Sequence, residues 1–212
     1  MNKHSARLSV IVAVFTLLML TCTAGVLCTS TEHFLLHDEY GLAEPEYENR
    51  VLEAAEKALA SYLSMGYKSP VNISDPENIS PHDKIDIYIR NLLEAADGKK
   101  VYGSAETEGK NGYDYIEIAN DAGEQLEFAV AHEVFHTIQD AYDIQERRYP
   151  WIVEGTAELM ASRVYSATSG YELINWENAF LSFPQKSLLA RKYDATVFWV
   201  YISQVSVSYT HL

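Results

Sequence analysis

The chain has few cysteines and few basic residues. Its 212 residues include only two cysteines, Cys22 and Cys28, both near the N-terminus. The rest of the chain therefore has no thiols for an internal disulfide or for a cysteine-rich structural zinc site. Lys and Arg total 16 against 30 Asp and Glu, and no basic stripe interrupts this acidic excess. A surface that follows nucleic-acid phosphates needs clustered basic residues, so nucleic acid is excluded as the main partner.

One long stretch lacks charge altogether. Residues 8–28 carry no charged side chain, and Lys3 and Arg7 precede them. A positive segment before an apolar run predicts a signal peptide or an uncleaved N-terminal anchor over residues 1–30. The run approaches the roughly 20 residues that span a bilayer, so its length does not separate these two, and Cys22 adds lipid attachment as a third alternative. In each case the remainder is expected to be exported, either secreted or held at the outer face of the cytoplasmic membrane, which it would contact only through this segment.

Residues 31–212 are expected to form one α+β domain, because their pattern mixes helical and alternating periodicities. We expect helices at about 45–65, 122–140, 151–165 and 189–205, strands at 84–90 and 113–118, and a loop or hairpin connection at 97–112. A capping box formed by Asp121 and Glu124 is expected to open the second helix. The predicted fold is a small antiparallel or mixed sheet packed on the second helix and followed by further helices.

The second expected helix carries the sequence His132-Glu133-Val134-Phe135-His136, which matches the H-E-x-x-H zinc signature. Four residues along a helix correspond to about 6 Å of rise and about 40° of rotation. Both imidazoles then emerge on one face and can converge on one ion, while Glu133 can reach a water on that ion without ligating it. The alternative is an amphipathic helix that carries two histidines by chance.

A catalytic zinc keeps three protein ligands and an open position, so the two histidines need a third partner. Glu154 lies eighteen positions after His136 and can supply it from a neighbouring helix. Glu158 falls one turn further on the same face, where it can accept the second N–H of a zinc-bound histidine. The alternative for both glutamates is a solvated acidic helix face.

The segment His132-Glu133-x-x-His136, followed by Trp151-x-x-Glu154-Gly155-x-Ala157, resembles the gluzincin zinc metallopeptidases. This group of the peptidase MA-like superfamily includes thermolysin and the zinc aminopeptidases. The resemblance covers residues 113–165 well and the remainder in outline. It implies a zincin-like fold with His132, His136 and Glu154 as zinc ligands and Glu133 as the general base. It also implies that strand 113–118 is an edge strand that pairs with an extended substrate.

Two departures from the family refine this expectation. The zinc aminopeptidases hold the substrate amino terminus with a Gly-x-Met-Glu-Asn segment that we do not find here, which favours an endopeptidase. Gluzincins also use a later Tyr or His to stabilise the oxyanion. Residues 191–195 loosely resemble their tyrosine-bearing helix, so Tyr193 is the candidate, with a packing tyrosine as the alternative. A further C-terminal subdomain is either missing from this sequence or dispensed with in a minimal version.

The function predicted from the sequence is therefore an exported zinc metallopeptidase that acts on peptide or protein substrates. Two alternatives from other classes stay open. The first is an exported binding or adhesion domain with a non-catalytic zinc site. The second is a zinc hydrolase of non-peptide amides or esters, which the same ligands would support.

Overall fold

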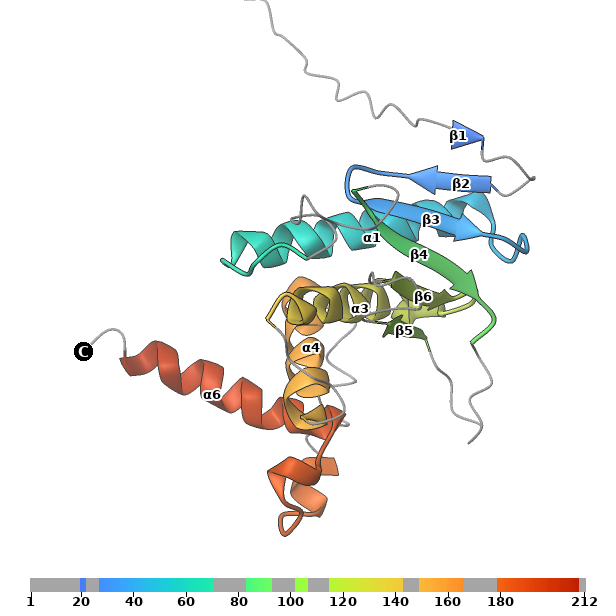
Figure 1. Cartoon of the computed structure of the whole chain (residues 1–212). Helices are drawn as coiled ribbons and strands as arrows, with labels where there is room; N and C mark the ends of the chain where they lie inside the picture. Colours follow the sequence, from blue (N-terminus) through green and yellow to red (C-terminus); the bar gives the residue numbers. More distant parts are fainter. Residues whose placement is uncertain are drawn as a thin grey trace, which may run out of the picture.

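The computed structural model describes residues 20–21, 27–70, 83–92, 102–106, 115–142, 149–165 and 179–209, which form a mixed sheet and a set of helices (Figure 1). The strands are β1 (Leu20–Thr21), β2 (Leu27–Ser30), β3 (Phe34–Asp38), β4 (Ile85–Arg90), β5 (Gly103–Glu106) and β6 (Tyr115–Ala119). The helices are α1 (Pro45–Ser64), α3 (Leu126–Asp140), α4 (Pro150–Val164) and α6 (Thr196–Tyr209), with 3₁₀ turns η1 (Gly123–Gln125), η2 (Leu188–Ala190) and η3 (Tyr193–Ala195). The predicted α+β class is confirmed.

The sheet has the order β1-β2-β3-β4-β6-β5. Its three central strands β3, β4 and β6 are parallel, whereas β1 and β2 at one end and β5 at the other pair antiparallel to their neighbours. Ile87 of β4 lies opposite Leu36 of β3 and Ile116 of β6. The sheet is therefore mixed, and the two strands predicted from alternation correspond to β4 and β6.

The core lies between one face of this sheet and the helices α1 and α3. Alternate strand residues such as Phe34, Ile87 and Ile118 are fully buried there, as expected for one face of a pleated strand. Helix α1 begins with proline at its first turn and buries residues at helical spacing, ending in Tyr62. The Tyr62 hydroxyl donates a hydrogen bond of 2.9 Å to the carbonyl of Ala131, which joins α1 to α3.

The prediction that strand 113–118 lies at the edge of the sheet is wrong, because this strand corresponds to β6, which has a neighbour on each side. Strand β6 pairs with β4 on one side and with β5 on the other, where Gly103 lies opposite Ile118. Among the described residues, the strand at this edge of the sheet is β5, which lies in the segment predicted as a loop or connection; the structure describes residues 102–106 of that segment. Its Gly-Ser-Ala composition has weak strand propensity, so only the pairing with β6 makes it a strand.

The last helix also begins later than predicted. Residues 188–190 and 193–195 form the separate turns η2 and η3, and α6 starts at Thr196 rather than near 189. Arg191 between the turns has extended backbone angles, and its buried guanidinium pairs with Asp194 at 2.5 Å. Asp194 also accepts a hydrogen bond from the backbone N–H of Lys192. These local side-chain bonds compete with a regular helix over this stretch.

The second predicted helix is present at the expected position, but its first turn differs from the prediction. It opens with the 3₁₀ turn η1 instead of an α-helical turn, and neither η1 nor α3 has a side-chain cap hydrogen bond. The expected capping box is therefore absent.

Part of the predicted leader contributes strands. β1 and β2 fall within residues 1–30, and β2 pairs with β3. The other residues of that segment lie outside the described part of the chain. Among the described residues, no helix is long and apolar enough to cross a membrane.

Candidate metal centre

Helix α3 has two faces of opposite character. Ala131, Val134 and Ile138 are fully buried in the apolar core. His132 and His136, one turn apart, emerge on the opposite side of the helix, toward α4. The aromatic rings of these two histidines lie 4.7 Å apart at a steep angle. The predicted helical spacing therefore places both imidazoles on one face.

Helix α4 brings two buried glutamates to this face. Pro150 stands at its first turn, where the missing N–H of proline does no harm. The Glu154 Oε2 atom lies 3.2 Å from Nε2 of His132 and 3.8 Å from Nε2 of His136. Donor atoms of these three residues lie within 4.8 Å of one another, and Glu154 and His132 are buried. The group is able to hold a metal ion.

The hydrogen bonds around the histidines leave one nitrogen of each for such an ion. Glu158 Oε2 lies 2.9 Å from Nδ1 of His132. Gln139 Oε1 lies 2.7 Å from Nδ1 of His136, and the Gln139 amide nitrogen donates to the carbonyl of Val153 at 2.8 Å. That second bond identifies the Gln139 oxygen as an acceptor. Both Nδ1 atoms therefore act as donors, and both Nε2 atoms are directed toward Glu154.

The ionisable side chains of the centre have strongly shifted pKa values. Burial opposes the charged form of His132, but hydrogen bonds to Glu154 and Glu158 and the charge of Glu133 raise its pKa well above 6.5. Burial and the neighbouring His132 lower the pKa of His136 to about 4. Burial alone would raise the pKa of Glu154, yet the hydrogen bonds and charges of His132, His136 and Lys192 lower it to about 2. The carboxylate of Glu154 is thus ionised over a wide pH range, as a metal ligand must be.

Glu133 lies between the metal group and the edge strand β5. Its side chain is buried, and its Oε2 atom is 4.0 Å from Nε2 of His136. A Cβ at Gly103 of β5 would lie 2.7 Å from Cγ of Glu133 and 3.0 Å from its Oε1. Strand β5 therefore passes directly over Glu133, and this close approach requires glycine.

Tyr193 and Lys192 border the centre from the η3 turn. The Tyr193 ring is 6.1 Å from the ring of His132. Burial and the charge of Glu154 raise the pKa of Tyr193 to about 12, so its hydroxyl stays protonated at neutral pH. Lys192 Nζ lies 2.8 Å from Oε1 of Glu154, whereas the contacts of Glu154 with the two histidines are made by Oε2.

The segment with Tyr193 is held close by small residues on α4. A Cβ at Gly155 would lie 2.9 Å from Cδ1 of Trp199 and 3.1 Å from Cβ of Ala195. The Thr196 hydroxyl donates to the Gly155 carbonyl at 3.0 Å. The glycine after Glu154 thus lets η3 and α6 pack against α4 beside the metal group.

The structure brings together every predicted site residue: His132, Glu133, His136, Glu154, Glu158 and Tyr193. Sequence reasoning missed Gln139, Lys192 and Gly103. Gln139 could have been found from its position, because a residue three after His136 lies on the same helix face. Lys192 and Gly103 carry no comparable local pattern, since their contacts join distant segments of the chain.

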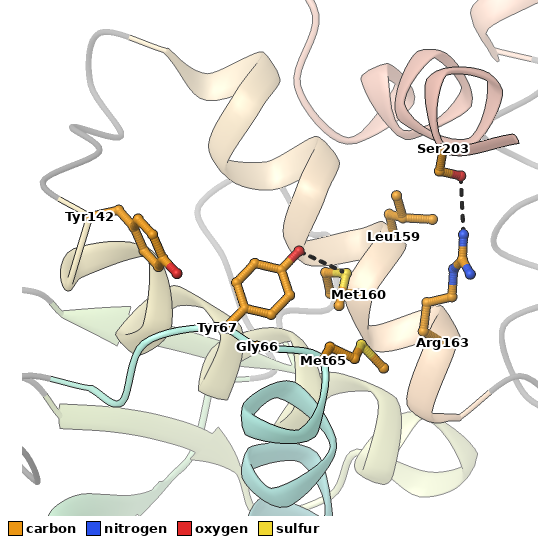
Figure 2. Close-up of a pocket in the computed structure, with 8 residues that line it drawn as sticks. All are labelled: Met65, Gly66, Tyr67, Tyr142, Leu159, Met160, Arg163 and Ser203. Carbon is orange, nitrogen blue, oxygen red and sulfur yellow. Dashed lines mark hydrogen bonds between the residues drawn. The ribbon is translucent and has the colours of Figure 1, made fainter. Parts of the chain in front are cut away.

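A separate groove of about 380 Å³ lies between the end of α1, α4 and α6 (Figure 2). It is lined by Met65, Gly66, Tyr67, Tyr142, Leu159, Met160, Arg163 and Ser203. Arg163 is nine residues after Glu154, which corresponds to about half a turn of rotation away on the helix. Helix α4 therefore separates this groove from the metal group.

Comparison with known proteins gives no match, either to a family model or to a curated protein sequence.

Proposed function

We propose that this chain is a zinc-dependent metallopeptidase, with a zincin-like catalytic arrangement and endopeptidase activity. The observation that carries the proposal is the convergence of His132, His136 and Glu154 beside a further buried glutamate, Glu133. A structural site would need a fourth protein ligand, whereas three ligands leave a position open for catalysis.

The donor set fits zinc. Two imidazole nitrogens and one carboxylate oxygen form a His₂Glu set, which is used by catalytic zinc in hydrolases. Glu158 and Gln139 fix the tautomers of the two histidines, as outer partners of zinc-binding histidines do. When bound, zinc polarises a carbonyl and lowers the pKa of water from 15.7 to about 7.

The neighbouring residues can perform the proton transfers of peptide hydrolysis. Glu133 accepts a proton from the attacking water and passes it to the leaving amine. The Tyr193 hydroxyl stays protonated and so can donate a hydrogen bond to the oxygen on which negative charge develops. Both side chains face the metal group from different elements, one from α3 and one from η3.

Strand β5 favours peptides over small esters as the substrates. It is the last strand of the sheet among the described residues, so one edge of its backbone is not paired within them. An extended peptide can add to such an edge through backbone hydrogen bonds. Gly103 places this edge over Glu133, so a peptide paired with β5 would present its backbone to the general base.

Export remains a prediction from the positive and apolar N-terminal segment, and we retain it as part of the proposal. Export would place the protein or peptide substrates of the enzyme outside the cytoplasm.

The deciding experiment compares the purified wild type with Glu133→Gln and with Glu127→Gln. Glu127 lies on the same helix and pairs with Arg50 at 2.7 Å, so its variant is a matched control. Each protein is analysed for zinc and incubated with unstructured peptides blocked at both ends. We expect about one zinc per chain in all three, and hydrolysis about 10²–10⁴-fold slower in Glu133→Gln alone.

Other outcomes separate the alternatives. A wild type with one zinc and no hydrolytic activity would support a binding domain. Hydrolysis of amide or ester libraries without peptide cleavage would support a non-peptide hydrolase.

A further inference from the structure

Glu154 presents its two carboxylate oxygens to different partners. Oε2 lies 3.2 Å and 3.8 Å from the Nε2 atoms of His132 and His136. Oε1 lies 2.8 Å from the ammonium nitrogen of Lys192. Oε2 therefore contacts the two histidines of the metal group, and Oε1 contacts the ammonium group of Lys192.

The Lys192 backbone is held in place by its neighbours. Arg191 is buried and pairs with Asp194, which in turn accepts a hydrogen bond from the Lys192 backbone N–H. The next turn, η3, is attached to α4 because Thr196 donates to the carbonyl of Gly155. Gly155 directly follows Glu154, so the same packing that anchors η3 sets the distance between Lys192 and the carboxylate.

Burial makes this ion pair different from an ordinary surface pair. The Glu154 side chain is 5% exposed, whereas that of Lys192 is 48% exposed. A buried carboxylate oxygen without a partner is costly, and a charged donor satisfies it at short range. The half-exposed Lys192 side chain therefore pairs with a carboxylate that is itself buried.

We propose that Lys192 is a positioning residue that restricts Glu154 to binding metal through Oε2 alone. This inference rests on the proposed metal centre. Offering both oxygens to an ion would require the carboxylate to turn and to disrupt the 2.8 Å contact between Oε1 and the ammonium group. Binding through one oxygen would leave more of the ion open to a water and a substrate carbonyl than binding through two. Lys192 thereby keeps the site open for catalysis without touching the reacting atoms.

The test compares cobalt(II) and zinc binding by wild type, Lys192→Met, Lys192→Arg and Lys186→Met. Arginine keeps a cation and N–H donors for Oε1. Lys186 is a matched control, since it is 43% exposed and approaches Asp194 at 4.0 Å, on the same segment of chain. The visible absorption spectrum of bound cobalt(II) reports the number of ligands, and competition with a chelator gives the zinc affinity.

We expect Lys192→Met to shift the cobalt(II) spectrum toward a higher ligand number and to weaken zinc binding about 10-fold or more, as loss of an outer partner does. Lys192→Arg and Lys186→Met should retain the wild-type spectrum. Lys192→Ala repeats the comparison if Lys192→Met does not fold. An unchanged spectrum in the folded variant overturns the proposal whatever the zinc affinity. A wild type that binds neither metal overturns the metal centre itself, whereas a wild type that binds zinc without cleaving peptides contradicts only the proposed reaction.

Discussion

The two faces of α3 are built on different principles. One face, with Ala131, Val134 and Ile138, is buried among the isoleucines of the sheet and the side chains of α1. The other face carries His132 and His136 and is covered by the glutamates of α4. Apolar burial on the first face is non-directional and depends on area. On the second, each buried polar atom needs a partner at a defined distance.

The apolar face of α3 therefore contributes mainly to stability, and the polar face mainly to the proposed function. A substitution on the apolar face should change the free energy of unfolding and leave the metal group intact. A substitution on the polar face should change metal binding or hydrolysis first.

Glu154→Ala should abolish stoichiometric zinc binding, because it removes one of the three ligands that the described residues bring together. Ligand binding stabilises the folded state by about 2.7 kcal/mol at a concentration 100 times Kd. A chelator should therefore lower the melting temperature of wild type and leave that of Glu154→Ala unchanged, with no added effect of a reducing agent. Elemental analysis and thermal unfolding check both parts. One zinc retained by the variant would contradict the three-ligand centre.

Ile138→Ala should lower the free energy of unfolding by about 2–5 kcal/mol, the usual range for such a truncation in a core. Its side chain is fully buried on the apolar face of α3. Zinc affinity of the folded variant should equal that of wild type. Denaturant unfolding and chelator competition measure the two quantities. A weakened affinity would show that the two faces are coupled.

Gly103→Ala should slow hydrolysis about 10²-fold, because small displacements of catalytic groups have effects of that size. The new Cβ would collide with Cγ of Glu133 and displace its carboxylate, while zinc binding should persist. Ser104→Ala is the control, since the Ser104 hydroxyl contacts Glu117 on a neighbouring strand. Steady-state kinetics measure the rate of hydrolysis, and zinc analysis measures the metal content of both variants. Equal rates in the two variants would count against the close packing of β5 on Glu133.

Glu158→Gln should weaken zinc binding about 10–100-fold, as substitutions of outer partners typically do. The amide is a poorer acceptor for Nδ1–H of His132, which then orients the ring less firmly. Glu48→Gln provides a buried glutamate outside the centre, paired with Thr29 in the structure. Competition titrations should show an effect only for Glu158→Gln.

In the metal-free protein, the ionisable groups of the centre should contribute most to the free energy of unfolding near pH 6–7. The pKa values of Glu154 and His136 are lowered to about 2 and about 4, so the unfolded chain binds more protons below pH 6.5 and stability falls on acidification. The pKa of His132 is raised, so its contribution is full below pH 6.5 and is lost as the pH rises through that raised pKa. Unfolding curves at several pH values in chelator check this. The alkaline loss should vanish in His132→Gln, which carries no titrating group there.

Much of the centre followed from the sequence by itself. His132, Glu133 and His136 share one helix, so helical geometry alone relates their positions. Glu154 and Glu158 are likewise one turn apart on one helix. Alternation of isoleucines predicted β4 and β6, because one face of each strand is buried against the helices.

Other features of the site depend on contacts between segments that are far apart in the sequence. The edge position of β5 depends on pairing between Gly103 and Ile118, which no local propensity in Gly-Ser-Ala encodes. The contact of Lys192 with Glu154 joins residues 38 positions apart and exists because η3 packs against Gly155. Periodicity describes which side chains share a face of one element. Which faces meet is determined by the burial and hydrogen bonding of the whole chain, and there the carboxylate of Glu154 acquires its two different partners.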